Sequence, residues 1–227
     1  MIDLHTHSLF SDGQLIPSEH IRRFEMLGYS AVAITDHGDA SNLDFIIPRI
    51  VKLAAFLNTA QPVKVIPGIE LTHVPPGSIG TLVREARDLG ASLVIIHGET
   101  NVEPVAPGTN RAGIEAGADI LAHPGLIDDE TARLAAAAGT LLELSARSGH
   151  SLTNGHVARI ALDSGAKLVL NSDAHSSGDM MTEEFARRVL SGAGLPATAF
   201  EVVMSNARRL LEKIGYPVEL TAGSSDL

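Results

Sequence analysis

Histidine and carboxylate side chains recur at the ends of short apolar segments throughout this sequence. The first such segment ends at His5 and His7, and the last ends at Asp173 and His175. Imidazole nitrogens and carboxylate oxygens are the ligands that zinc, manganese and iron ions take in proteins. A zinc site with an open position uses about three protein ligands, so this many candidates predict two or three ions. The candidate metal ligands are His5, His7, Asp12, His37, Glu70, His97, His123, Asp173 and His175.

The segments that carry these residues alternate between two kinds. Short, nearly all-apolar runs alternate with amphipathic segments up to about residue 192, as in parallel strands covered by helices. Ser18, Asp128 and Asn154 are predicted N-caps, and several helices are predicted to end at glycine. Strands are predicted over residues 2–7, 31–36, 63–70, 92–97, 119–123, 140–145 and 167–172. Helices are predicted over residues 18–28, 43–58, 78–89, 109–117, 128–138, 154–164, 182–192 and 203–214.

About seven strand–helix units close most naturally into a barrel, although an open sheet of the same strand count has the same pattern. The polar residues decide between the two. Active sites of α/β barrels lie at the C-terminal ends of the strands, where the ligand candidates occur in this sequence. We therefore predict a single barrel domain over residues 1–215, followed by a C-terminal tail over residues 216–227.

The spacing of residues along each predicted strand indicates which side chains can bind a metal ion and which can only orient the ligands. Side chains alternate along a strand, so His5 and His7 share one face, and Asp173 and His175 do so if the strand continues that far. Adjacent Asp36 and His37 cannot both bind one ion from a regular strand, so we predict that His37 is the ligand and Asp36 orients the site. Glu70 is the natural carboxylate to bridge two ions.

The ordered motifs resemble the polymerase and histidinol phosphatase (PHP) family. The resemblance covers residues 3–175 and consists of His5-x-His7, Thr35-Asp36-His37, Gly68-x-Glu70, His97, His123 and Asp173-x-His175. It implies a distorted (β/α)7 TIM-like barrel with two or three zinc, manganese or iron ions. The implied activity is hydrolysis of a small phosphate ester, such as histidinol phosphate or a nucleotide, by a metal-activated hydroxide.

The resemblance also implies how the ligands are shared among the ions. One ion would be bound by His5, His7, Glu70 and Asp173, a second by Asp12, His37 and His175, and a third by Glu70, His97 and His123. Some family members have histidine where Asp12 stands. Asp36 and His175 are predicted to be catalytic.

Other residues near the predicted mouth are candidates for contact with substrate. Arg147 follows the sixth strand, where a guanidinium would grip a phosphate, and His150 comes shortly after it. Arg111 is a weaker candidate, and the proline-rich loops at residues 74–77 and 102–108 are predicted to form walls. His20 and His156 fall inside helices and are predicted to be structural.

Composition limits the partners and the compartment. A net charge of −10 over 227 residues argues against long nucleic acid as a partner, which leaves a small phosphorylated substrate. The absence of cysteine excludes thiolate metal sites. Because no apolar run approaches the length of a membrane helix, we expect a cytoplasmic protein without membrane contact.

Two other functions share parts of this pattern. Amidohydrolases also open with His-x-His and end with an aspartate, but they usually carry a bridging lysine. Here Glu70 takes that place, and Lys64 lies at the beginning of its strand. A non-catalytic scaffold, such as the PHP-like subunit of ribonuclease P, has no need to retain nine ligands.

Overall fold

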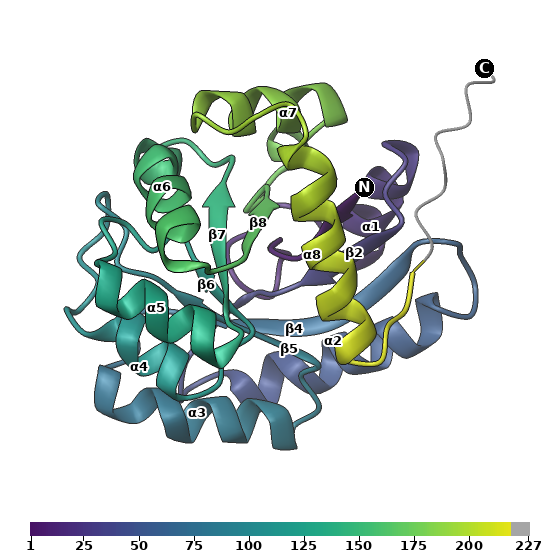
Figure 1. The fold of residues 1–227 in the computed structure, drawn as a ribbon. Coiled ribbons are helices and arrows are strands. Elements are labelled where there is room, and N and C mark those ends of the chain that lie inside the picture. Colours follow the sequence, from purple (N-terminus) through teal and green to yellow (C-terminus); the bar gives the residue numbers. More distant parts are fainter. Residues whose placement is uncertain (219–227) are drawn as a thin grey trace.

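The computed structural model describes residues 1–218, which form a nearly closed barrel of parallel strands surrounded by helices (Figure 1). The strand order is β1-β2-β4-β5-β6-β7-β8, and the short β3 pairs with the end of β4. The strands are β1 (Ile2–Asp3), β2 (Ala31–Ile34), β3 (His37–Gly38), β4 (Lys64–Leu71), β5 (Leu93–His97), β6 (Ile120–Ala122), β7 (Leu141–Ser145) and β8 (Leu168–Asn171). The helices are α1 (Pro17–Met26), α2 (Leu43–Leu57), α3 (Pro76–Asp88), α4 (Thr109–Glu115), α5 (Asp129–Ala138), α6 (Asn154–Ser164), α7 (Glu183–Gly192) and α8 (Ala199–Lys213).

The first and last strands are joined just beyond their ends, at the mouth of the barrel. The backbone N–H of Asp173 donates to His5 O at 3.0 Å, and that of His7 donates to Ala174 O at 2.9 Å. Thr6 and Ala174 form a parallel bridge, and α8 contacts both β1 and β8 along the seam. This closure brings the first and last predicted ligand pairs together and confirms the predicted single-domain barrel.

The strands at the mouth are shorter than predicted. The predicted strand 2–7 pairs with β2 only over Ile2–Asp3, because the chain beyond it turns to bond with the end of β8. The predicted strand 31–36 ends early, at Ile34, and the short strand β3 (His37–Gly38) follows beyond its predicted end. Both interruptions occur where side chains turn towards the mouth.

Two of the three predicted N-caps are wrong. Asp128 caps α5 by accepting from Thr131 N at 2.7 Å, but α1 begins at Pro17 after Ile16, so Ser18 lies within the helix. Asn154 is the first residue of α6, and its side chain bonds both to Ser145 N and to Ser145 O. Asn154 therefore fastens α6 to the end of β7.

The predicted tail lies mostly outside the described residues, which end at 218. Tyr216 and Val218 pack against the core, and the Tyr216 hydroxyl lies 3.2 Å from Ser92 Oγ. The boundary at residue 215 stays a prediction. Across residues 1–218 we find no helix with the length and apolar character needed to traverse a bilayer.

His20 on α1 lies in the core, with its ring against Phe24 at 5.0 Å, and burial lowers its pKa to about 4. As pH falls from 6.5 towards 4, the unfolded chain gains a proton at this residue before the native state does, so stability decreases. We expect His20 to lower the free energy of unfolding of the metal-free protein by up to about 3 kcal/mol as pH falls through this range. Urea unfolding of the metal-free wild type and His20→Leu at several pH values measures this, and equal pH dependence in the two proteins would contradict it.

Candidate metal centre

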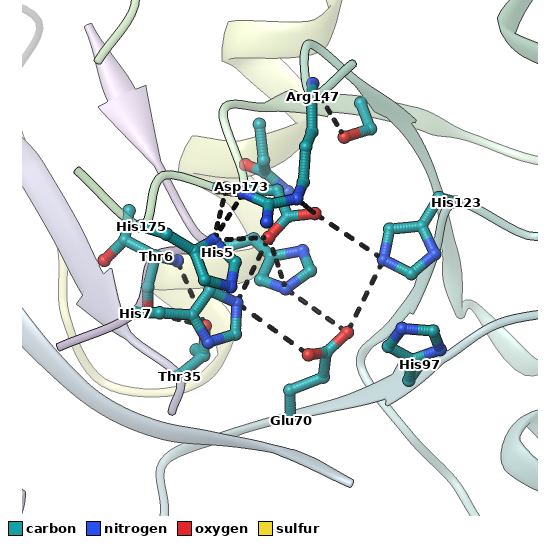
Figure 2. A network of polar contacts seen from close by, with 12 residues as sticks. His5, Thr6, His7, Thr35, Glu70, His97, His123, Arg147, Asp173 and His175 are labelled. Carbon is teal, nitrogen blue, oxygen red and sulfur yellow. Dashed lines mark hydrogen bonds and ion pairs between the residues drawn. The ribbon is translucent and has the colours of Figure 1, made fainter. Parts of the chain in front are cut away.

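All nine predicted ligands lie at the C-terminal mouth of the barrel, in one connected cluster. Figure 2 shows Glu70 facing His5, His7 and His123, with Asp173 on the other side of the cluster. The backbone turns just after β1 and β8 supply His5, His7, Asp173 and His175. Strands separated by long stretches of sequence therefore place their ligands around a shared space.

Glu70 occupies the middle of this cluster and is fully buried. One carboxylate oxygen lies 3.3 Å from His5 Nε2 and 3.7 Å from His123 Nε2. The other lies 2.7 Å from His37 Nδ1 and 3.8 Å from His7 Nε2. Burial alone would raise the pKa of Glu70, but His5 and His37 outweigh it and hold the pKa well below its usual value. A carboxylate that faces ligands on two sides is suited to bridge two ions.

Two predicted ligand sets come together in the structure. His5, His7 and Glu70 can share an ion, and Asp173 lies 3.2 Å from His7 Nε2. The second set gathers around His175, whose Nε2 lies 3.1 Å from Asp12 Oδ1. It also includes His7, which was predicted only for the first ion.

The third set differs in composition from the prediction. His97 and His123 lie together, with ring centroids 4.6 Å apart, but the histidine that joins them in a metal-sized group is His150. Glu70 reaches His123 at 3.7 Å. His150 was predicted only to contact substrate.

Several buried ligand atoms have no hydrogen-bond partner among the described residues. A buried polar atom without a partner costs about 1–3 kcal/mol. A divalent cation would satisfy such atoms, because neutral imidazole and carboxylate are the donors it binds. The donor set therefore fits metal ions. The unpartnered cluster atoms are His5 Nε2, both ring nitrogens of His7, Glu70 Oε1, His97 Nδ1 and His123 Nδ1.

The backbone is strained where it presents some of these ligands. His123 and Asp173 have φ angles of 27° and 54°, in a region that residues other than glycine rarely adopt. Such conformations cost roughly 1–3 kcal/mol each and persist where the surrounding structure enforces them. Beside His97, Gly98 packs so closely on the Ala122 carbonyl that a Cβ there would clash with it. The native state therefore tolerates an unfavourable backbone conformation at His123 and Asp173, and this conformation directs their side chains into the cluster.

Asp36 supports the site indirectly. Its buried carboxylate accepts from Ser8 N and Ser8 Oγ, both at 2.7 Å, and from Ser11 Oγ at 2.8 Å. These bonds hold the turn that precedes Asp12, so Asp36 orients a loop that carries a candidate ligand. Its predicted catalytic role, like that of His175, stays a prediction.

Arg147 lies at the exposed edge of the cluster (Figure 2). Its Nη1 lies 3.2 Å from Asp173 O and 2.7 Å from His175 Nδ1, and a third of the side chain is exposed. The weaker candidate Arg111 forms ion pairs with Glu115 and Glu130 on the outer helices.

Sequence reasoning missed two acidic residues of the site. Glu103, in the loop predicted to form a wall, lies 3.1 Å from both His97 Nε2 and His73 Nε2. The hydrogen bond to His97 lowers the pKa of Glu103 to about 2, against a smaller opposing effect of burial. Glu143, inside the apolar strand β7, accepts from His5 Nδ1 and from Asn171 Nδ2, both at 2.8 Å. A lone carboxylate within an apolar strand was the available signal for Glu143.

Glu143 fixes the orientation of His5. Its bond to Nδ1 keeps the proton on that nitrogen and leaves His5 Nε2 facing Glu70 and Asp173. Glu143→Gln replaces an acceptor oxygen with a competing donor group, so we expect Zn²⁺ affinity to fall roughly 10–100-fold while the fold is retained. Chelator-competition titration measures this, with Asp163→Asn on the exposed face of α6 as the control. Unchanged affinity in Glu143→Gln would show that His5 needs no such support.

Comparisons with known proteins find similarity over most of the chain. The family model of the PHP domain matches residues 3–188. An uncharacterised protein of Methanocaldococcus jannaschii is 45% identical over 215 residues, covering 93% of this chain and 99% of that protein. A protein of Edwardsiella ictaluri named "probable phosphatase" is 30% identical over 242 residues, covering 96% of each chain. A solved amidohydrolase structure matches with a TM-score of 0.60 over 94% of this chain and 73% of that one, at 16% identity, which shows the fold alone.

The matched segment includes all nine predicted ligands, from His5 to His175, and almost the whole barrel that positions them. The chain belongs to the PHP domain family.

Proposed function

We propose that this protein is a metal-dependent phosphoesterase that hydrolyses a small phosphate ester with two or three divalent ions. The observation that carries the proposal is the position of Glu70, buried between His5 and His123 on one side and His7 and His37 on the other. Adjacent ions sharing one carboxylate suit phosphoryl transfer, in which both the attacking and the leaving oxygen need stabilisation. The relative named as a probable phosphatase supports the same activity.

Charge supports an anionic substrate at this mouth. The whole chain carries a net charge of −10, which disfavours long nucleic acid. When bound, divalent ions would outweigh the ligand carboxylates, polarise a phosphoryl group and lower the pKa of a water molecule. A small phosphate ester is thus the proposed substrate, and zinc, manganese and iron all suit the donor set.

Arg147 is the proposed phosphate-binding residue. Its guanidinium lies beside Asp173 and His175 at the exposed edge. A phosphate over the cluster could therefore accept hydrogen bonds from its N–H groups. We expect Arg147→Ala to raise KM roughly tenfold or more, because a charged hydrogen bond contributes about 1.5–3 kcal/mol. Steady-state kinetics with a phosphomonoester, with Arg159→Ala on α6 as control, measure this. An unchanged KM would exclude Arg147 from binding phosphate.

The amidohydrolase alternative rests on the fold alone. The amidohydrolase of known structure shares the barrel at 16% identity, whereas here the central bridging position holds Glu70 and Lys64 lies at the start of β4. The scaffold alternative leaves the buried unpartnered ligand atoms unexplained.

A substrate panel tests the proposal. The purified protein, loaded in turn with Zn²⁺, Mn²⁺ or Fe²⁺, is assayed against phosphomonoesters, including histidinol phosphate and nucleotides, against phosphodiesters, and against dipeptides. We expect turnover of at least one phosphate ester that is lost on chelation and restored by metal. The proposal would be contradicted if the protein hydrolysed only dipeptides. It would also be contradicted if protein with its full metal content hydrolysed none of these compounds.

A further inference from the structure

We propose that a cavity at the N-terminal ends of β7 and β8 binds a small organic phosphate that also carries a hydrogen-bond donor. The cavity has a volume of about 290 Å³. Its walls come from the end of α5, the turns before β7 and β8, and the last two turns of α8. The metal ligands lie at the opposite, C-terminal ends of the strands. The cavity is therefore separate from the metal cluster and from the activity proposed for it.

Three cationic side chains line this cavity, namely Lys167, Arg209 and Lys213. Arg209 and Lys213 are four residues apart on α8, so they share one face of the helix. Among residues 1–218 none of the three forms an ion pair, whereas the neighbouring Arg208 pairs with Glu212 at 3.8 Å. A chain with a net charge of −10 thus gathers positive charge at one cavity, which favours an anionic ligand.

Helix termini near the cavity reduce this positive charge but do not cancel it. The helices α5, α6 and α8 all end on this side of the barrel, and the C-terminus of a helix carries about half a negative charge. Three such termini amount to roughly −1.5 charges, which is less than the charge of the three cationic side chains. A phosphate would therefore enter a positive environment and accept charge-assisted hydrogen bonds from lysine and arginine.

Asn206 supplies a hydrogen-bond acceptor inside the cavity. It is among the lining residues, although only 8% of its surface is exposed. Its Nδ2 donates to Leu168 O at 2.8 Å, which fixes the orientation of the amide. The amide oxygen then faces away from β8 and has no hydrogen-bond partner among the described residues. An N–H or O–H group of a ligand could donate to this oxygen.

Apolar side chains provide the remaining surface that a ligand needs. Ala135, Leu141 and Leu210 line the cavity and are themselves almost completely buried. Small-molecule sites typically combine such apolar surface with a few precisely placed polar groups. The volume of about 290 Å³ is near the lower end of the range for these sites. We therefore expect a compact ligand, with an apolar body between its phosphate and its donor group.

The test locates binding by nuclear magnetic resonance. The purified protein, labelled with ¹⁵N, is titrated with 4-aminophenylphosphonate, which has an apolar ring, an anionic head, an amine, and a C–P bond that a phosphoesterase does not hydrolyse. We expect the amide signals of Gly139, Leu141 and Gly165, beside the cavity, to shift with a Kd in the millimolar range or below. Phenylphosphonate, which lacks the amine, should bind several-fold more weakly. Aniline, which lacks the anion, should not bind measurably.

Variants of α8 test the role of the cations. Arg209→Gln/Lys213→Gln should weaken binding roughly tenfold or more, because charged hydrogen bonds to the phosphonate are lost. Arg133→Gln on α5 and Lys52→Gln on α2 are the matched controls, since both side chains are exposed and lie outside the cavity. Both control variants should bind as wild type does.

The inference is overturned if none of the probes shifts the amide signals beside the cavity, or if shifts appear only at the metal mouth, near Arg147 and His175. It is also overturned if the double variant binds as tightly as wild type, or if the two controls lose as much affinity as the double variant. Equal binding of the two phosphonates would exclude Asn206 as the acceptor of a ligand hydrogen bond.

Discussion

Replacing Asp173 with asparagine should abolish phosphatase turnover and release bound metal. The Asp173 carboxylate lies 3.2 Å from His7 Nε2 and 3.8 Å from both His5 Nε2 and His123 Nε2. It is therefore placed to bind an ion together with the histidines at the centre of the cluster. Asparagine keeps the shape and tolerates the φ of 54° at this position, but removes the charge. Metal ions contribute several kcal/mol to stabilising the transition state, so we expect kcat/KM to fall roughly 10³-fold or more.

The measurement combines metal analysis with phosphomonoester kinetics on the same preparation. Asp163→Asn, which makes the same change on the exposed face of α6, is the matched control and should behave as wild type. If Asp173→Asn kept its metal and turnover, Asp173 would be excluded as a ligand.

Glu70→Gln should cause the second large loss and should affect more than one ion. Because its two oxygens face His5 and His123 on one side and His7 and His37 on the other, a single substitution removes a ligand from adjacent positions. We expect at least two ions to be weakened and activity to fall roughly 10³-fold or more.

Asp12→Asn distinguishes the proposed bridging role of Glu70 from that of a residue proposed to bind a single ion. Asp12 is half exposed at the edge and contacts only His37 and His175 of the cluster, so its loss should weaken one ion. Chelator titrations of the two variants measure the number of ions affected. Loss of a single ion in Glu70→Gln would contradict the bridging role.

The barrel and the gathering of the nine candidate ligands at one mouth could be predicted from sequence, because both follow from local patterns. Parallel strands buried on both faces are apolar, so His97 and His123 at their ends stand out, and parallel order places all such ends at one mouth. The structure brings these residues together. It adds the bonds from Asp173 and His7 across the seam, which no periodicity predicts.

The supporting residues depend on how loops and turns fold, which local pattern does not specify. His150 follows a glycine turn and forms a short 3₁₀ helix, so its burial against His123 could not be inferred from spacing. Glu103 lies in a proline-rich loop whose path is set by contacts with Gly149 and His150. Glu143 carried a usable signal, because a carboxylate inside an apolar parallel strand needs a buried partner.

Crystals of the protein grown with Zn²⁺ and recorded at the zinc absorption edge test the central claim most directly. The predicted result is at least two anomalous peaks at the C-terminal mouth, one between His5, His7 and Asp173, with Glu70 touching more than one peak. If the protein binds its full complement of zinc in solution but the crystals show no peaks at the mouth, or show peaks only on the outer surface, the account is contradicted.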